Sequence, residues 1–299
     1  MNLNKLSLKD KGLFLKLLSL TAHELSVYAF QNVYMWHNLF DIYWAKIQNN
    51  LCLFFKDKIG CFLYLPPLGE RIKPEVIAKV FKIMDKFNGN QALSRIENVE
   101  EKDLSFYQHL GYSFRFKSYD YLCERSSLVE LRGNRFKSKR ACVNYFTKNY
   151  KFRYIDFIPR YSNDCINLYK SWMNARQVEN TDRVYRGMLL DNLSCLQILL
   201  SDYRNLDLVG KAVEIDNQIK GFSFGFELNK DTFCILFEIT DLSFKGLSQY
   251  IFRQFCAEAK KYKYINIMDD SGLENLKNVK MSYRPDRFVP SYIITRGNG

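Results

Sequence analysis

Two adjacent carboxylates stand at a place in the chain where general-base catalysis is possible. Asp269 and Asp270 lie at the end of the strand predicted for residues 264–270 and precede Gly272. A carboxylate at a strand end beside a cleft can take a proton from an incoming hydroxyl or amine. Asp270 is therefore a candidate base. The alternative is structural, because an Asp here could also cap the helix predicted to start near Leu273.

Glu238 is the single charged residue in the apolar strand predicted for residues 232–240. An unpaired carboxylate is costly to bury, so Glu238 either faces a cleft or meets a cation such as Lys245 or Lys280. Lys280 lies in an otherwise apolar passage from helix to strand, where an ammonium could neutralise a phosphate or a developing oxyanion. Arg284 is the nearby alternative to Lys280. Glu238 is thus a second candidate base, and Lys280 is a candidate charge stabiliser.

Five cations fall within nine positions near the middle of the chain: Arg132, Arg135, Lys137, Lys139 and Arg140. Such a cluster can hold phosphates or an RNA backbone, and the aromatic residues that follow it could stack on bases. If the segment is helical, Arg140 and Asn144 share one face. We expect phosphate to bind at Arg132, Lys137, Arg140 and Asn144. The alternative is a solvated basic helix.

The elements that must position these residues occur twice along the chain. The first set is a hairpin over 51–65 and a helix over 74–87, followed by a short helix that ends at Gly111 before a strand. The second set is a hairpin that turns at Asp216–Asn217, a strand over 232–240, a helix over 247–262 and a strand over 264–270. This order predicts two copies of one α/β unit.

The composition shifts between the two copies, over residues 115–165, where cations and aromatic residues are dense. A helix over 126–149 is predicted here, with an interruption or cap near Gly133. We therefore expect an N-terminal domain over 1–150, which includes the basic connecting helix, and a C-terminal domain over 151–299.

Length and charge limit the classes of protein to which the chain could belong. Its 299 residues suit two domains, and nearly half of them are apolar, so the chain can form large cores. No apolar run is long enough to span a membrane, and charges interrupt the N-terminal segment where a signal peptide would be apolar. The formal charge of +12 favours polyanionic partners such as RNA, acidic lipid headgroups or nucleotides. We expect a cytoplasmic location, with peripheral binding at the inner membrane face as an option.

Eight cysteines are scattered along the chain without any CxxC pair, and there are only three histidines. This spacing does not fit a structural zinc site, so no metal is expected. Several of the cysteines stand next to Leu, Phe or Ile, which is typical of reduced thiols in a core.

Three ordered motifs carry a family resemblance, and an aromatic segment at 30–44 agrees with them. Residues 120–146 hold D-Y followed by L-x-G-x-R-x-x-x-K-R-x-x-V-N-x-F, residues 237–255 hold a Glu-bearing strand and Gly-Leu-x-Gln, and residues 266–285 hold N-x-x-x-D-x-G-L-x-x-L-K-x-x-K-x-S-Y-x-P. Together they resemble the soluble branch of the phosphatidylglycerol lysyltransferase C-terminal-like family. The chain departs from that pattern at Ile267, Met268 and Ser271.

The resemblance implies an α/β fold of two tandem acetyltransferase-like (GNAT) domains with mixed sheets, related to the Fem-type aminoacyltransferases. It also implies aminoacyl transfer from aminoacyl-tRNA to a lipid, or to a small amine or hydroxyl acceptor, without a tightly bound cofactor. The matching positions add further binding residues to the phosphate cluster: Gly246, Gln249, Tyr283 and Arg284. In this scheme tRNA and an acidic lipid headgroup or small acceptor are the expected partners, and Asp270 or Glu238 is the base.

The loop of residues 241–246 indicates whether acetyl-CoA could be the acyl donor. Acetyl-CoA-dependent relatives carry several glycines there, whose backbone N–H groups hold pyrophosphate at a helix N-terminus. This chain has only Gly246. The loop therefore favours a donor other than acetyl-CoA. The alternatives that remain open are an acyl-CoA-dependent N-acyltransferase and a non-enzymatic basic binding protein on the same fold.

Overall fold

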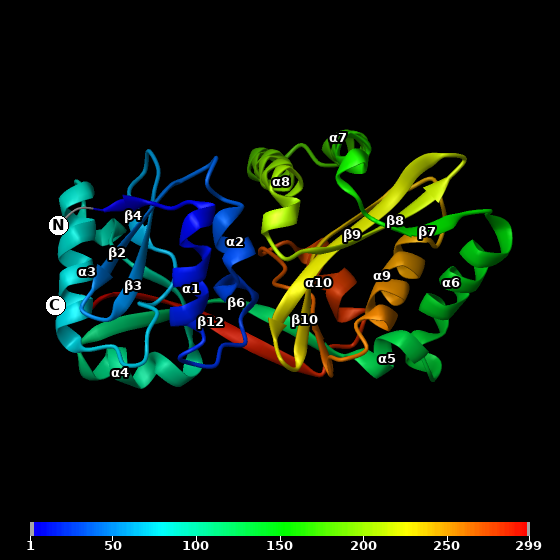
Figure 1. The fold of residues 1–299 in the computed structure, drawn as a ribbon. Coiled ribbons are helices and arrows are strands. Elements are labelled where there is room, and N and C mark those ends of the chain that lie inside the picture. Colours follow the sequence, from blue (N-terminus) through cyan, green and yellow to red (C-terminus); the bar gives the residue numbers. More distant parts are fainter. Residues whose placement is uncertain (1–2, 298–299) are drawn as a thin grey trace. The chain divides into compact units, whose positions relative to one another are not determined.

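The computed structural model describes residues 3–297 and divides the chain into two compact units (Figure 1). Unit 1 takes in the chain up to Asp120, the short segment Asp269–Gly272 and the chain from Phe288 onward. Unit 2 takes in Tyr121–Met268 and Leu273–Arg287. Unit 1 is therefore discontinuous in sequence.

Unit 1 is a mixed sheet with helices packed on it. Its strands lie in the order β1-β2-β3-β4-β5-β12, with the first part of β6 beside β12. Its strands and α-helices are β1 (Asn4–Lys5), α1 (Lys11–Leu18), α2 (Phe30–Tyr34), β2 (Asp41–Ile47), β3 (Asn50–Lys56), β4 (Cys61–Leu63), α3 (Pro74–Phe87), β5 (Ile96–Glu100), α4 (Leu104–His109), β6 (Tyr112–Glu124) and β12 (Arg287–Arg296).

Helix α3 shows why this sequence folds as it does. Pro74 occupies the first turn, where its missing N–H is not needed. The helix buries Val76, Val80, Phe81 and Met84 on one face against β3 and β4. Each side chain of this size contributes about 1.5–3 kcal/mol when it is fully buried. Packing of this stripe therefore holds α3 on the sheet.

Unit 2 has the strand order β6-β11-β10-β9-β8-β7, with β6 represented by its last residues. Its further strands and α-helices are α5 (Arg125–Glu130), α6 (Lys137–Asn149), β7 (Arg153–Asp156), α7 (Ser162–Glu179), α8 (Arg183–Ser201), β8 (Val209–Ile215), β9 (Gln218–Asn229), β10 (Thr232–Thr240), α9 (Leu247–Glu258), β11 (Tyr264–Asn266) and α10 (Glu274–Met281).

Each unit contains a parallel strand pair joined by a crossover helix. In unit 1, α3 connects β4 to β5, and in unit 2, α9 connects β10 to β11. The hairpins β3–β4 and β8–β9 are antiparallel. The predicted α/β class with mixed parallel and antiparallel strand pairing is therefore confirmed. The predicted turn at Asp216–Asn217 is also confirmed, because both residues have the positive φ that a two-residue hairpin turn requires.

The bounds of the compact units differ from the halves 1–150 and 151–299 expected from the sequence. Helix α6 packs against α9 and so belongs to unit 2, although it precedes residue 150. Strand β12 pairs with β5 and so belongs to unit 1, although it lies near the end of the chain. The predicted interruption near Gly133 is present, because Leu131 and Gly133 both have positive φ between α5 and α6.

Candidate functional site

Glu238 lies in a row of polar residues across the sheet of unit 2. Ser223 on β9 is directly opposite Glu238 on β10, and Lys211 on β8 is directly opposite Ser223. Glu238 is half-buried, and its Oε2 atom is fully buried with no hydrogen-bond partner in the described part of the chain. The buried Ser223 hydroxyl is in the same condition. The Ser223 hydroxyl still acts on the Glu238 carboxyl across the strand pair, and neither group has a well-formed hydrogen bond, so a water molecule or a ligand could complete this polar pair.

The separation of two parallel strands places Glu238 beside an unpaired stretch of backbone. Strands β10 and β11 are paired only as far as Cys234 and Asn266, whereas β10 continues to Thr240. Beyond Asn266 the chain leaves β10, with Met268 in the left-handed region, and continues its pairing with β6 at Tyr121. Ligands in open α/β sheets bind at the carboxyl ends of parallel strands. Glu238 occupies that kind of position.

The electrostatics around Glu238 favour proton transfer near neutral pH. Burial raises the pKa of its carboxyl to about 8, and the nearby Lys139 ammonium and the Ser223 hydroxyl offset this only in part. Lys139, half-buried on α6, has a lowered pKa because burial disfavours its charge. Its Nζ lies 4.1 Å from the centre of the Tyr283 ring. A carboxyl with a pKa near the working pH can both accept and return a proton.

Lys280 is buried on α10, and its ammonium donates a hydrogen bond to the carbonyl oxygen of Ile267. That carbonyl lies just beyond the end of β11, where the chain leaves β10. The contact therefore holds the strand separation open beside Glu238. The predicted role of Lys280 as a charge stabiliser stays a prediction.

Asp270 belongs to unit 1, whereas Glu238 and Lys280 belong to unit 2. Its Oδ1 accepts a hydrogen bond from the backbone N–H of Gly272 at 2.9 Å. The capping alternative is wrong, because α10 begins at Glu274 and its N-cap, Leu273, has no side-chain hydrogen bond. The carboxylate closes a local turn instead.

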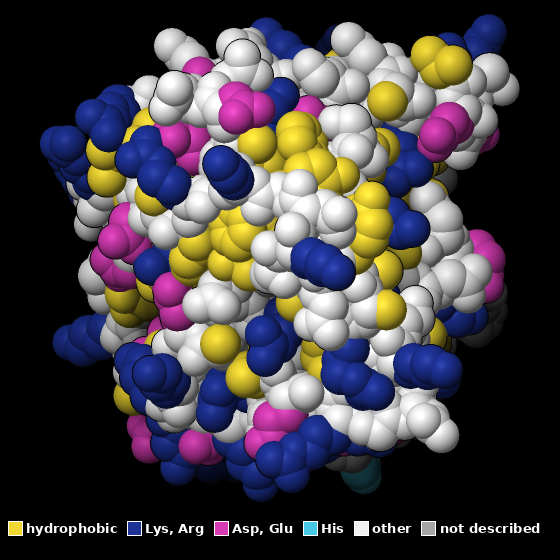
Figure 2. Space-filling view, turned by 90° about the vertical axis from the view of Figure 1, so that its right-hand side faces the viewer, with side chains coloured by type: hydrophobic (Ala, Val, Ile, Leu, Met, Phe, Trp, Pro, Cys, Tyr) yellow, Lys and Arg dark blue, Asp and Glu magenta, His cyan; other side chains and the backbone are white. Residues whose placement is uncertain are grey.

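The basic cluster is only partly available for phosphate. Arg140 donates to the carbonyl oxygens of Leu131 and Gly133, which closes the turn after α5. Arg132 pairs with Glu130 at 2.9 Å on the surface. Lys137 and Asn144 are exposed on α6. In the face that Figure 2 presents, Lys and Arg side chains are spread around hydrophobic patches.

Gly246 serves the packing of two helices. It has φ +89° and stands at the N-cap of α9, where an added Cβ would overlap the carbonyl oxygen of Cys142 on α6. The backbone of α6 therefore lies directly against the start of α9. Gln249, in the first turn of α9, is half-buried.

The last two predicted binding residues have different surroundings. Tyr283 is buried and packs on Phe252, with ring centres 4.2 Å apart, besides lying under Lys139. Arg284 is exposed, with a positive φ. Tyr283 is therefore the one of the two that borders the Glu238 environment.

Sequence reasoning named Lys139 only as one of five clustered cations, and it did not name Ser223. The signal for Lys139 was its spacing, because it precedes the buried Val143 by one helical turn and so lies on the inward face of α6. The signal for Ser223 was its polarity within the apolar strand over residues 219–226. Either observation could have linked these residues to Glu238.

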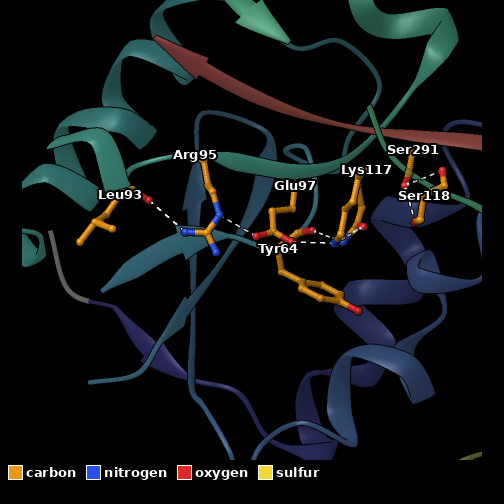
Figure 3. Close-up of polar contacts among 8 residues, drawn as sticks. Tyr64, Leu93, Arg95, Glu97, Lys117, Ser118 and Ser291 are labelled. Carbon is orange, nitrogen blue, oxygen red and sulfur yellow. Dashed lines mark hydrogen bonds and ion pairs between the residues drawn. The ribbon is translucent and has the colours of Figure 1, made fainter. Parts of the chain in front are cut away.

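A second polar cluster lies in unit 1 and is shown in Figure 3. The buried carboxylate of Glu97 accepts from Arg95 and from Lys117, at 2.7 Å each. Lys117 also donates to the Asn98 side chain, which in turn donates to the carbonyl oxygen of Tyr64. Two cations thus hold the pKa of Glu97 below its usual value despite burial. The cluster ties the end of β4 to β5.

Within residues 3–297 there is no group of three or more His, Cys, Asp or Glu side chains that could hold a metal ion. None of the cysteines forms a disulfide, and all except the half-buried Cys142 are buried, as predicted for core thiols. In that same range, no helix has the length and apolar character needed to cross a bilayer.

Comparison with known proteins gives a family and several structural relatives. The family model described as phosphatidylglycerol lysyltransferase, C-terminal, matches residues 19–295. No curated protein matches the chain.

Three solved structures illustrate the similarity. A conserved protein of unknown function from Bacteroides thetaiotaomicron is 22% identical, with a TM-score of 0.88, over 99% of this chain and 100% of that one. L-PGS from Bacillus licheniformis is 15% identical, with a TM-score of 0.68, over 99% and 94%. A tandem GNAT protein from the clavulanic acid biosynthesis pathway is 8% identical, with a TM-score of 0.51, over 100% and 99%. At these identities the likeness concerns the fold, which is that of tandem acetyltransferases.

Proposed function

We propose that this chain transfers an aminoacyl group, because it belongs to the phosphatidylglycerol lysyltransferase C-terminal family. Membership supports an acyltransferase or aminoacyltransferase in general terms. The donor we propose is an aminoacyl-tRNA, and the acceptor is a lipid, or a small amine or hydroxyl compound.

The observation that carries this proposal is the half-buried Glu238 carboxyl at the point where β10 and β11 separate. In its ionised form Glu238 takes the proton from the attacking amine or hydroxyl as that group adds to the ester carbonyl of the donor. The tetrahedral intermediate then collapses, the ester C–O bond breaks, and Glu238 returns the proton to the departing ribose oxygen. No covalent enzyme intermediate is needed. The positive charge of Lys139, and that of Lys280, would stabilise the negative charge on the carbonyl oxygen.

The nature of the donor follows from the start of α9. Acetyl-CoA binding in this fold depends on N–H groups presented by a glycine-rich loop at a helix N-terminus. Here the single glycine, Gly246, is packed against the backbone of α6. This contact supports a donor other than acetyl-CoA. A net charge of +12 is compatible with a tRNA donor and with an acidic lipid headgroup.

The test is single-turnover deacylation of aminoacyl-tRNA in the presence of cell lipid or amine extracts. Glu238→Gln should slow the transfer by about 10²–10⁴-fold, because the base is removed while the shape is kept. Glu227→Gln on β9 is the matched control, since Glu227 is exposed and pairs with Lys261 on the surface. A Glu238→Gln protein that transfers as fast as the control would refute the assignment of the base.

A second measurement separates the donors. Thermal unfolding with acetyl-CoA, and separately with aminoacyl-tRNA, should show stabilisation by the tRNA and little shift with acetyl-CoA. The opposite result, together with acetyl transfer, would favour an acyl-CoA-dependent N-acyltransferase. If neither donor binds, the protein is a binding module.

A further inference from the structure

Unit 1 contains a cavity of about 230 Å³ that the proposed transfer reaction does not use. It is lined by the segment of residues 66–72, which connects β4 to α3, and by Asp103 and Phe106. Thr21, His23, Tyr28 and Lys102 complete the lining. A volume of this size suits a small molecule of about the size of an amino-acid derivative.

Two residues that line this cavity and a buried carboxylate behind them form a nucleophile–base–carboxylate arrangement. The Thr21 Oγ1 atom lies 2.8 Å from His23 Nε2, and His23 Nδ1 lies 3.1 Å from Glu100 Oε2. The Thr21 side chain is exposed and lines the cavity, whereas Glu100 is buried behind the ring. A hydroxyl, an imidazole and a carboxylate in this order have the geometry of an activated nucleophile.

The ionisation of the Glu100 carboxyl bears on which ring nitrogen of His23 donates a hydrogen bond. Burial alone would raise the pKa of this carboxyl, but hydrogen bonds from His23, Lys102 and the backbone N–H of Glu24 lower it to about 2. Glu100 is therefore ionised and accepts the Nδ1–H of His23 in the tautomer that the chemistry proposed below requires. Nε2 is then the acceptor for the Thr21 hydroxyl, as general-base activation requires.

The imidazole is also held rigidly. The ring of His23 stacks on Tyr28, with centres 4.0 Å apart and planes 15° apart. The Tyr28 hydroxyl donates to the carbonyl oxygen of Asn98, and the Asn98 side chain belongs to the network with Lys117 and Tyr64 (Figure 3). The polar cluster of unit 1 thus fixes the platform on which the base lies, which favours catalysis by orientation.

The walls of the cavity indicate a class of substrate. Asp103 is half-buried and lines the cavity, where the charges of Lys102 and His23 act on its carboxyl from nearby. A carboxylate can receive an ammonium group, and Phe106 is also part of the lining. Pro66 and Leu68 offer an apolar surface to a side chain. A small ester of an α-amino acid combines these features, because it has an ammonium, a side chain and a reactive carbonyl.

We propose that this cavity is a hydrolytic site for small aminoacyl esters, with Thr21 as the nucleophile. His23 takes the proton of the Thr21 hydroxyl as Oγ1 adds to the ester carbonyl, and it gives that proton to the departing alcohol as the C–O bond breaks. Water then attacks the Thr21 ester with His23 again as base. The amino acid leaves, and the hydroxyl of Thr21 is restored. Lys102, whose ammonium is 2.6 Å from Glu100, lies at the rim as a cation.

The test uses the full chain and alanine p-nitrophenyl ester, with p-nitrophenyl acetate as the probe that lacks an ammonium. The wild-type protein should hydrolyse the aminoacyl ester faster than buffer, and Thr21→Ala should bring the rate down to that of buffer. Thr21→Ser should keep activity, because the hydroxyl is retained. Thr147→Ala is the matched control, since Thr147 is an exposed threonine whose hydroxyl donates to the carbonyl oxygen of Asn144.

Two further readouts separate catalysis from a purely structural role of this loop. Rapid acid quench followed by mass spectrometry should find an alanyl group on the peptide that contains Thr21. Asp103→Asn should raise KM for the aminoacyl ester much more than KM for the acetate. If the wild-type protein does not exceed the buffer rate, or if Thr21→Ala is as active as wild type, Thr21 and His23 only anchor the loop and the proposal is overturned.

Discussion

Replacing Glu238 by Gln should stabilise the fold at alkaline pH, even though it removes the proposed base. The pKa of the Glu238 carboxyl is raised from 4.5 to about 8 in the folded protein. At about 1.4 kcal/mol per pKa unit, ionising this group in the folded state costs at most about 5 kcal/mol. We expect about half of that, roughly 2–3 kcal/mol, because the residue is partly exposed and because Lys139 loses a nearby carboxylate.

The sign of the effect follows from linkage. Below pH 4.5 the carboxyl is protonated in both the folded and the unfolded chain, so its contribution to stability is fully present. As the pH rises towards 8 the unfolded chain ionises first, and the wild type progressively loses that stability. Gln does not titrate. The gain of the Glu238→Gln protein over the wild type should therefore be small at pH 5 and reach its full size at pH 9.

Urea unfolding of both proteins at pH 5 and pH 9 measures this difference. Glu227→Gln is again the control, and its effect should have the opposite sign, because Lys261 and Tyr262 lower the pKa of the Glu227 carboxyl. An equal stability difference at the two pH values, or a Glu238→Gln protein that is less stable than wild type at pH 9, would refute the assignment of a desolvated carboxyl.

Other changes test other parts of the structure. Gly246→Ala should lower the free energy of unfolding by at least about 2 kcal/mol, because residue 246 has a positive φ and the new Cβ would overlap the Cys142 carbonyl oxygen. A melting curve unchanged from wild type would contradict the packing of α6 on α9. Arg140→Met should cost about 1–3 kcal/mol in urea unfolding through two carbonyl groups left without their donor. In a thermal melt, a tightly bound ligand at 100 times its Kd stabilises by about 2.7 kcal/mol, and we expect acetyl-CoA to fall far short of this.

The repeated architecture could be predicted because it follows from local patterns. The hairpin turn at Asp216–Asn217 and the helical stripe of Val76, Val80 and Met84 are both visible in short windows of sequence. The unit boundaries could not be predicted in this way. They depend on which strand β12 pairs with, and that pairing joins residues almost 200 positions apart.

The candidate site shows the same division between local and long-range information. Glu238 was visible as a lone carboxylate in an apolar strand. Its surroundings were not, because Lys139 approaches it only through the packing of α6 against α9. Arg140 stood out as a phosphate ligand in the sequence, but its guanidinium is engaged by two backbone carbonyls. Main-chain acceptors of this kind leave no trace in the pattern of side chains.

The discontinuity of unit 1 has a consequence for folding during synthesis. Strand β12 lies between β5 and β6 in the sheet order, yet the ribosome makes it after all of α5 to α10. Unit 1 therefore cannot complete its sheet while the chain grows, and one edge of β5 stays unpaired until β12 is made. Most of unit 2, in contrast, is made in one continuous stretch. Pairings of such long sequence separation form slowly. We expect unit 2 to become protease-resistant first in arrested nascent chains, with β5 as the segment most in need of chaperone protection.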